Sequence, residues 1–190
     1  MDGHFYALLA RMRYIQRWAL MRNTEPENIQ EHSHMVAILA HALALLQNKH
    51  FGGHIDPGQA ALLALYHDAT EILTGDLPTP IKYYNPDIKT AYKEVERIAG
   101  NRLLDMLPPE LRSSYTHYVL EDDAELEPFV KAADKLSAHI KCLEEQKAGN
   151  TEFDSASQQT LDALRAMNRP ELEWFLDNCL QAFTLNLDQL

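Results

Sequence analysis

A histidine and an aspartate adjoin within an apolar stretch of the chain, at His67 and Asp68. Burying an imidazole and a carboxylate without a partner costs free energy, so the pair indicates either a ligand site or a structural or surface role. Glu71 lies four residues after His67 and three after Asp68, and on a helix all three side chains can lean toward one pocket. A nitrogen and an oxygen ligand beside a further carboxylate suit a divalent metal that activates water.

Two other polar residues stand where they could complete such a site. His32 lies near the start of the preceding apolar segment, from which it can reach the same pocket. In that segment we expect His34 to be a surface or capping histidine and His41 to lie in the core or at an interface. Asp134 lies beside two alanines in a later segment, where it could close a metal site; a lone aspartate on a helix is otherwise exposed to solvent.

The elements that carry these residues are predicted to be helices. Apolar residues recur at helical spacing, and no segment alternates as a half-buried strand does. Asn28 with Glu31 predicts a helix N-cap, and Gly149 with Asn150 predicts a helix stop. We expect one all-α domain over residues 1–190, with about eight helices at 4–18, 29–48, 58–73, 87–106, 109–120, 126–147, 155–167 and 170–183.

The charge of the chain is negative but unevenly distributed. Seventeen Lys and Arg against 28 Asp and Glu give a net charge of −11, which opposes binding to nucleic acid polymers. The first 24 residues nevertheless carry four arginines against one aspartate. This cluster is the natural anion site, although a single arginine in it could equally belong to the solvated face of a helix. Its members are Arg11, Arg13, Arg17 and Arg22.

Composition places the chain among globular proteins. With 46% hydrophobic and 24% charged residues it can bury a core, which excludes disordered and collagen-like classes. Cys142 and Cys179 are too few for a disulfide framework or a paired-cysteine zinc site. No signal peptide is visible, and the most apolar segment, 35–46, is shorter than the roughly 18–20 residues that span a bilayer. We therefore expect a cytoplasmic protein with no membrane partner.

The ordered set His32, His67-Asp68 and Asp134 resembles the signature of the HD-domain phosphohydrolases. Longer motifs narrow the resemblance to the bacterial 5′-deoxynucleotidases of the YfbR type, over residues 4–149 and more loosely beyond. Ala19 departs from the pattern, which has proline there. The matching motifs are Arg17-Trp18, Met21-Arg22-Asn23, Glu27-Asn28, Glu31-His32-Ser33, Tyr66-His67-Asp68-Ala69, Glu71 and the run from Leu73 to Pro80.

The resemblance implies a helical HD-domain fold around a metal pocket and a divalent-metal-dependent phosphomonoesterase. Its one ion, such as Co²⁺ or Mn²⁺, would be held by His32, His67, Asp68 and Asp134. A mixed nitrogen and oxygen site of this kind tolerates several metals. The substrate would be a deoxyribonucleoside 5′-monophosphate, with selection against ribonucleotides, and the protein would be a homodimer.

Roles for individual residues also follow from the resemblance. Arg17 would face the phosphate and Trp18 would wall the sugar, while Glu71 would be the general acid or base. Asp76 would bind the sugar 3′-hydroxyl or protonate the leaving oxygen, and these two roles stay open. Residues expected to contact substrate are Arg17, Trp18, His32, Asp68, Asp76, Leu77, Pro78, Thr79 and Asp134.

Two other functions remain open at this point. The same pocket could serve a different nucleotide, such as an alarmone, a cyclic nucleotide or a nucleoside triphosphate. Alternatively, the chain could be a non-catalytic nucleotide-sensing module with a degenerate site. The intact set of four ligands with Glu71 beside it favours catalysis, because a pure binding module needs no acid or base next to a metal.

Overall fold

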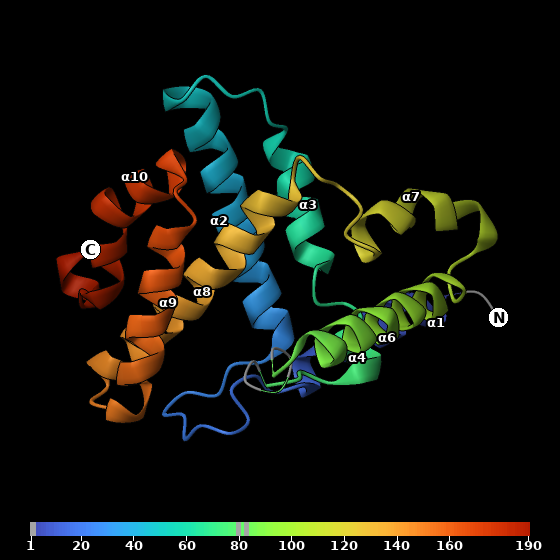
Figure 1. Ribbon diagram of the computed structural model, residues 1–190, viewed down its shortest axis with the longest axis horizontal. Helices are drawn as coiled ribbons and strands as arrows, with labels where there is room; N and C mark the ends of the chain where they lie inside the picture. Colours follow the sequence, from blue (N-terminus) through green and yellow to red (C-terminus); the bar gives the residue numbers. More distant parts are fainter. Residues whose placement is uncertain (1–2, 79–80, 82–83) are drawn as a thin grey trace.

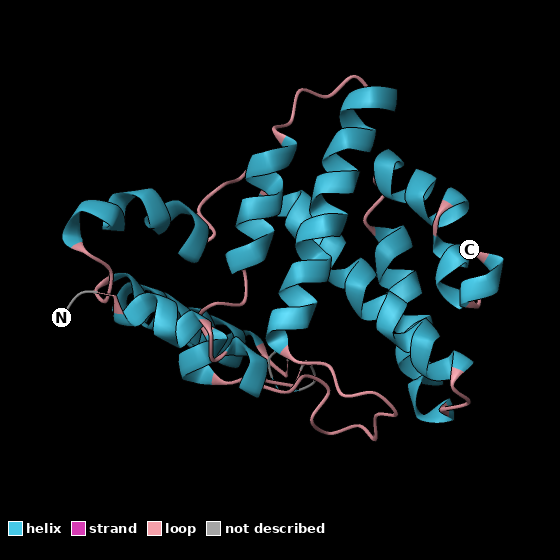
Figure 2. Ribbon diagram, turned by 180° about the vertical axis from the view of Figure 1, so that it is seen from behind, coloured by secondary structure: helices cyan, strands magenta, loops and turns pink. Residues whose placement is uncertain are grey.

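The computed structural model describes residues 3–78, 81 and 84–190, and within them the regular structure is helical (Figures 1 and 2). The all-α prediction is therefore confirmed. The α-helices are α1 (His4–Leu9), α2 (Ile29–His50), α3 (Pro57–Tyr66), α4 (Glu71–Thr74), α6 (Pro86–Leu104), α7 (Pro109–Val119), α8 (Glu127–Lys147), α9 (Asp154–Ala166) and α10 (Pro170–Asn178). Short 3₁₀ turns cover Met12–Tyr14, Thr151–Phe153, Leu180–Thr184 and Leu187–Gln189. None of the described helices is long and apolar enough to cross a membrane.

Two hydrophobic cores hold the helices together. In the larger core α2, α3 and α8 pack at the centre, and α9 and α10 cover one side of them (Figure 1). Leu43, Leu63 and Leu136 are fully buried there, one from each central helix. The smaller core joins α1, α6 and α7 through Phe5, Leu103 and neighbouring residues. Burying each large side chain of this kind contributes about 1.5–3 kcal/mol.

Local sequence signals place the ends of the two helices that frame the site. Asn28 caps α2: its side chain accepts from the Glu31 N–H, and the Glu31 carboxylate accepts from the Asn28 N–H. This capping box confirms the predicted N-cap. Helix α8 stops at Lys147, two residues before Gly149, whose φ of 84° is in the left-handed region that favours glycine.

The predicted helix over 4–18 is wrong, because α1 ends at Leu9. Residues 15–17 instead run alongside 27–29: the Arg17 N–H donates to the Glu27 carbonyl at 2.9 Å, and the Ile29 N–H to the Ile15 carbonyl at 3.0 Å. This long-range pairing holds residues 15–17 in an extended conformation, although their local pattern favours a helix. Arg17 and Trp18 therefore lie on an irregular segment. The predicted helix over 170–183 also ends early, at Asn178.

The predicted helix over 58–73 breaks at the His67-Asp68 pair. In a continuous helix the Ala64 carbonyl would accept from the Asp68 N–H, but here the His67 ring Nδ1 donates to it at 2.7 Å. The Ala69 and Glu71 N–H groups bond only three residues back, at 2.9 and 3.0 Å. A side chain that competes for a backbone carbonyl unwinds the helix into this tighter turn. Since Ala64 belongs to the larger core and Ala69 to the smaller, the turn lies where the two cores meet.

Candidate active site

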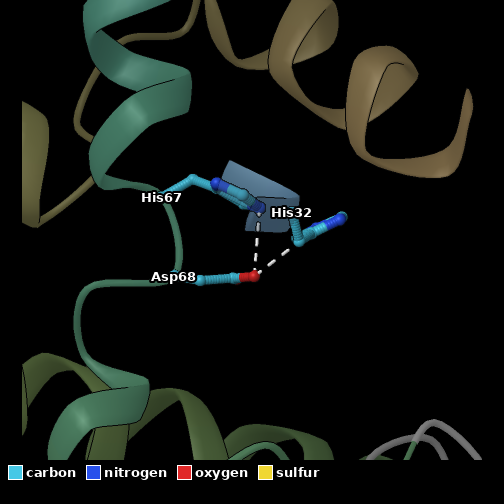
Figure 3. Close-up of side chains that lie close together, drawn as sticks. All are labelled: His32, His67 and Asp68. Atoms are coloured by element: carbon cyan, nitrogen blue, oxygen red, sulfur yellow. Dashed lines mark ion pairs between the residues drawn. The ribbon is translucent and has the colours of Figure 1, made fainter. Parts of the chain in front are cut away.

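Three of the predicted metal ligands converge in the structure. His32 projects from the first turn of α2, while His67 and Asp68 lie in the turn after α3 (Figure 3). Asp68 Oδ2 is 3.2 Å from His67 Nε2 and 3.6 Å from His32 Nε2. One ligand atom from each residue lies within 4.8 Å of the others, a spacing that could hold a metal ion.

The two imidazoles are oriented by their outer nitrogens. His67 Nδ1 donates to the Ala64 carbonyl, and His32 Nδ1 lies 3.2 Å from the Ser137 hydroxyl on α8. Both Nε2 atoms consequently face the cluster, where they are buried and have no hydrogen-bond partner among the described residues. Metal-bound histidines are oriented in this way, and a metal ion would satisfy two nitrogens that are otherwise costly to bury. The donor set therefore fits a divalent metal.

Asp134 lies at the edge of this cluster. Its Oδ1 is 3.1 Å from His32 Nε2, on the side of α8 that faces α2. It is outside the set of three mutually close ligand atoms, and its side chain is 40% exposed against 17% for Asp68. The structure thus brings Asp134 next to one ligand, and its place as fourth ligand stays a prediction.

The charges within the cluster reinforce one another. Burial lowers the pKa of His67, but neighbouring Asp68 offsets this and raises the pKa to about 10. Burial likewise raises the pKa of Asp68, yet His67, His32 and Arg17 together hold it well below its usual range. The pKa of Asp134 is also low, mainly because of His32. Both carboxylates are therefore ionised at neutral pH, as metal ligands must be.

Arg17 is the cation that borders the cluster. Its guanidinium donates from Nη1 to Asp68 at 3.3 Å and from Nε to Glu27 at 3.1 Å. Burial lowers its pKa, but Asp68, Asp134, Glu27 and Asp76 outweigh that effect and raise it. The guanidinium is thus held, fully charged, beside the histidine and aspartate ligands, where it could bind a phosphate.

Trp18 is held in an unusual backbone conformation next to Arg17. Its φ of 58° lies in the left-handed region, which bulky residues rarely adopt. The Trp18 carbonyl accepts from the Met21 N–H at 2.8 Å, and its indole N–H donates to Glu27 at 3.0 Å. The indole also packs at 5.4 Å on the Phe153 ring. Strained residues of this kind cluster at functional sites, where surrounding contacts keep them in place.

A cavity of about 800 Å³ opens beside the cluster, a volume typical of small-molecule sites. Its walls combine charged groups with apolar and aromatic groups. Predicted site residues that line it are Arg17, Trp18, Asp68, Glu71, Asp76, Leu77, Pro78 and Asp134. Thr79 lies outside the described residues.

Comparison with known proteins gives the family. A family model described as 5′-deoxynucleotidase YfbR-like matches residues 4–183. The chain belongs to the YfbR-like family. The 5′-deoxynucleotidase of Vibrio parahaemolyticus is 49% identical, over 100% of this chain and 98% of that protein. That of Shewanella oneidensis is 49% identical, over 99% of this chain and 97% of that protein.

Solved structures share the fold of this YfbR-like chain. An HD-domain phosphohydrolase from Listeria innocua has a TM-score of 0.81 at 19% identity, covering 97% of this chain and 90% of that one. A cyanophage S-2L HD phosphohydrolase, bound to dA and one catalytic Zn²⁺ ion, has a TM-score of 0.68 at 20% identity, covering 96% and 99%. The expected HD-domain fold is confirmed.

Some predicted site features of this family member lie elsewhere. Of the four arginines near the N-terminus, only Arg17 lines the cavity beside the histidine and aspartate ligands. Arg11 stacks on Tyr14 at 5.5 Å, and Arg13 donates to the Ala10 carbonyl. The cluster therefore does not form one anion site, because the segment that carries it is not a helix. His34 and His41 are both exposed, which confirms the surface role of His34 and contradicts a core role for His41.

The sequence prediction missed the roles of two residues that position the site: Ser137 was not identified, and Glu27 entered only as part of a family motif. Glu27 accepts hydrogen bonds from both Arg17 and Trp18, so it fixes two side chains of the irregular segment that line the cavity. Ser137 contacts His32 from α8. Its spacing of three from Asp134 was an available signal, because residues three apart share a face of a helix. The contacts of Glu27 depend on long-range folding and had no local signal.

Proposed function

We propose that the chain is a metal-dependent 5′-deoxynucleotidase, which hydrolyses deoxyribonucleoside 5′-monophosphates to deoxyribonucleoside and inorganic phosphate. Membership of the YfbR-like family gives the reaction class. The observation that carries the proposal in this chain is the convergence of His32, His67 and Asp68 beside Arg17, at the wall of a nucleotide-sized cavity. No specific observation favours an alarmone, a cyclic nucleotide or a nucleoside triphosphate, nor a non-catalytic module.

The metal is held, in this proposal, by His32, His67, Asp68 and Asp134. When bound, it would polarise the phosphoryl group and lower the pKa of a water molecule, so that a nucleophile is available at neutral pH. The cyanophage structure of the same fold, which holds a catalytic Zn²⁺ ion, and the cluster in this chain support a divalent ion, and we propose Co²⁺ or Mn²⁺. Metal analysis tests the ligand set: Asp134→Ala is expected to lower the metal content, and an unchanged content would remove Asp134 from it.

The protein's own side chains supply the remaining chemistry. Arg17 donates hydrogen bonds to the phosphoryl oxygens and offsets the charge that develops in the transition state. Glu71 is buried at the cavity wall, where it takes a proton from the attacking water. The bond between phosphorus and the sugar 5′-oxygen breaks, and that oxygen leaves with a proton. Asp76, at the same wall, either donates this proton or binds the 3′-hydroxyl.

Selection against ribonucleotides is attributed to the sugar side of the cavity. Trp18 is fixed there by its hydrogen bond to Glu27 and by Phe153, so its ring yields little space to a 2′-hydroxyl. Leu77 and Pro78 line the same cavity. Thr79, which lies outside the described residues, is proposed to contact the substrate. Lack of space carries this proposal, because an apolar wall that only leaves an added hydroxyl without a hydrogen-bond partner discriminates by about 10²-fold.

Phosphate release from matched nucleotides tests the function. We expect release from dAMP, dGMP and TMP with added Co²⁺ or Mn²⁺, and weak or no release from AMP. Equal hydrolysis of AMP and dAMP would contradict the selectivity, whereas release from a nucleoside triphosphate alone would contradict the phosphomonoesterase assignment.

A homodimer is part of the proposal, supported by an apolar stripe on α6. Ile88, Ala91, Val95 and Ile98 recur at spacings of three and four, and Val95 and Ile98 are 47% and 55% exposed. A stripe of this kind on a surface helix indicates a contact with another chain. Ile98→Glu is expected to halve the mass measured by sedimentation, whereas the exposed control Ile38→Glu on α2 leaves it unchanged.

The chain's organisation and location complete the proposal. One domain over residues 1–190 is supported by the shared boundary of the two cores at the His67–Thr70 turn. A cytoplasmic location is supported by the free thiols of Cys142 and Cys179, which suit a reducing compartment. Limited proteolysis tests the single domain. A chain that folds as one unit is expected to leave no stable fragment that contains only one of the two cores.

A further inference from the structure

Helix α9 forms a wall of the cavity that the proposed roles leave unused. Four of its residues, which share one face of the helix, line the cavity: Ser155, Ala156, Gln159 and Thr160. We call these four residues the α9 wall. The metal, the phosphate and the sugar are each matched to residues of other segments, whereas the nucleobase has no contact. The α9 wall and the nucleobase are therefore the two unmatched parts of the site.

The α9 wall lies farther along α8 than the metal cluster. His139 Nδ1 on α8 is 2.9 Å from Thr160 Oγ1, and Gln146 donates to Asp154 at 2.7 Å, so α9 runs antiparallel beside the second half of α8 (Figure 1). Asp134 lies five residues before His139, which is about 8 Å along the helix axis at a rise of 1.5 Å per residue. Since Asp134 and the α9 wall line the same cavity, the cavity extends from the cluster along α8 to α9.

Trp18 gives the same direction independently. Its neighbour Arg17 donates to Asp68, whereas the Trp18 indole packs on Phe153, the residue immediately before α9. Trp18 thus lies between the phosphate-binding guanidinium and the start of α9. A nucleotide with its phosphate at Arg17 and its sugar against Trp18 consequently extends toward the α9 wall, and the part that follows the sugar is the base.

The α9 wall carries the uncharged hydrogen-bonding groups that a base needs. Within the part of the chain that the structure describes, every serine, threonine and glutamine that lines the cavity belongs to α9. The Thr160 hydroxyl is used inside the protein, because it contacts His139 and donates to the Ala156 carbonyl at 2.8 Å. Gln159 is exposed and donates to the Ser155 hydroxyl at 3.0 Å, which leaves one amide hydrogen and the amide oxygen for a ligand. Nucleobases are recognised through hydrogen bonds of this kind to their edges.

The charge and shape of this wall suit an uncharged ring. Apart from the residues that already have roles, the charged residues among the described lining are Lys135 and Glu152, one of each sign. Glu152 accepts from the Arg22 N–H at 3.0 Å. Ala138 and Ala156 present methyl groups to the cavity, and a planar ring can pack on such a surface. The α9 wall therefore fits a neutral heterocycle better than a second phosphate.

We propose that the α9 wall is the base subsite and that Gln159 hydrogen-bonds the edge of the nucleobase. This inference rests on the proposed function and extends it to the base. An amide carries both a donor and an acceptor, and the Ser155 hydroxyl can pair with either end of it. Gln159 can therefore turn to meet a purine or a pyrimidine. Its contact favours a nucleotide over a sugar phosphate and discriminates little among the bases.

The experiment compares substrates with and without a base in Gln159→Leu. The KM for dAMP, dGMP and TMP is expected to rise about three- to tenfold, which corresponds to the loss of one hydrogen bond. Methyl 2-deoxyribofuranoside 5-phosphate has the sugar ring and the phosphate but no base, so its KM should change less than twofold. Gln158→Leu is the matched control: Gln158 is exposed, donates to Asp162 and is outside the cavity lining, so both constants should stay unchanged.

Turnover of dAMP by the unchanged protein is measured first, so that failure of the proposed function is seen separately. Calorimetric titration with deoxyadenosine, which has a base but no phosphate, gives a readout independent of turnover. Its binding should weaken in Gln159→Leu and stay unchanged in Gln158→Leu. An unchanged KM for all three nucleotides, or equal changes for dAMP and the methyl glycoside, would overturn the proposal. So would deoxyadenosine binding that is no weaker in Gln159→Leu than in Gln158→Leu.

Discussion

Asp68 is the residue on which the site converges. One of its oxygens is approached by Arg17, His67 and His32 at 3.3, 3.2 and 3.6 Å. Three cationic or protonatable partners around one partly buried carboxylate keep it ionised and oriented. The same arrangement would hold a metal between the two imidazoles, with the guanidinium next to it. Electrostatic preorganisation of this kind is the largest contribution in many phosphoryl-transfer sites.

Glu71 is the residue whose replacement is expected to separate catalysis from binding. Glu71→Gln keeps the size of the side chain but cannot accept a proton, so turnover of dAMP is expected to fall about 10²–10⁴-fold. Since Glu71 is outside the cluster of His32, His67 and Asp68, the metal content should stay unchanged. Steady-state kinetics measure the turnover of dAMP, and metal analysis measures the metal content. Glu110→Gln, an exposed carboxylate on α7, is the control. A loss below tenfold would contradict the role of Glu71 as a base.

The two thiols are expected to react at different rates. Cys142 is fully buried, and burial raises the pKa of its thiol to about 11. At pH 8 roughly one thiol in a thousand is then ionised, and only the thiolate reacts. Mass spectrometry after alkylation of the folded protein should find Cys179 modified well before Cys142. Denaturant should abolish the difference, and early modification of Cys142 in the folded protein would contradict the burial of that helix face.

Among individual residues, the sequence predicted the metal-ligand candidates better than the residues that hold the site's side chains in place. His32, His67 and Asp68 were recognisable because polar residues in apolar helical segments need a reason to be there, and the structure brings them together. Glu27 was not recognisable as a support, because its role arises from two contacts made across an irregular loop. The roles of Asp76 and Thr79 stay predictions.

At the scale of elements, helix starts were more predictable than helix breaks. The start of α2 follows from side chains within four residues, so Asn28 and Glu31 identified it. The break after Tyr66 has no glycine or proline to signal it, because it is made by the His67 ring binding a backbone carbonyl. The early end of α1 depends on pairing between segments about twelve residues apart. Interactions beyond one helical turn are what local patterns do not contain.

Glu145 is expected to fix the irregular segment onto α8. Its carboxylate is 1% exposed and accepts from the Thr24 N–H at 2.9 Å, the Thr24 hydroxyl at 2.7 Å and Asn150 at 2.8 Å, and it also pairs with Lys141. Burial raises its pKa, but these hydrogen bonds outweigh burial and hold the pKa well below the usual range. A carboxylate with so many donors stabilises the segment that carries Arg17 and Trp18.

Glu145→Gln is therefore expected to lower the free energy of unfolding at pH 7 by about 1–3 kcal/mol. Because the folded-state pKa is depressed, the contribution of Glu145 is present above its unfolded pKa of about 4.3 and is lost as the pH falls below it. The difference between the variant and the unchanged protein should thus shrink toward pH 3. Urea unfolding at several pH values measures it. Glu144→Gln, its exposed neighbour, should change stability by less than about 0.5 kcal/mol. Equal effects of both variants would contradict the role.

At the scale of the whole molecule, the site lies where two cores meet. The larger core supplies His32 and Asp134 through α2 and α8, and the turn that carries His67 and Asp68 leads from it into the smaller core. The net charge of −11 is consistent with this plan, since part of the carboxylate excess is gathered at the site around Arg17. A ligand that binds across the boundary connects the two cores, so metal binding and folding are expected to be linked.

Metal removal should consequently destabilise the whole chain. A ligand that binds only the folded state adds about 2.7 kcal/mol at a hundredfold excess over its dissociation constant, which for a chain of this size raises the Tm by about 5–10 °C. Adding Mn²⁺ to chelator-treated protein should produce this shift in thermal unfolding. His32→Ala should abolish it, because that variant removes a buried nitrogen aimed at the cluster. His34→Ala, two residues away on the same helix but exposed, should retain the shift. A shift that persists in His32→Ala would mean that the stabilising ion binds elsewhere.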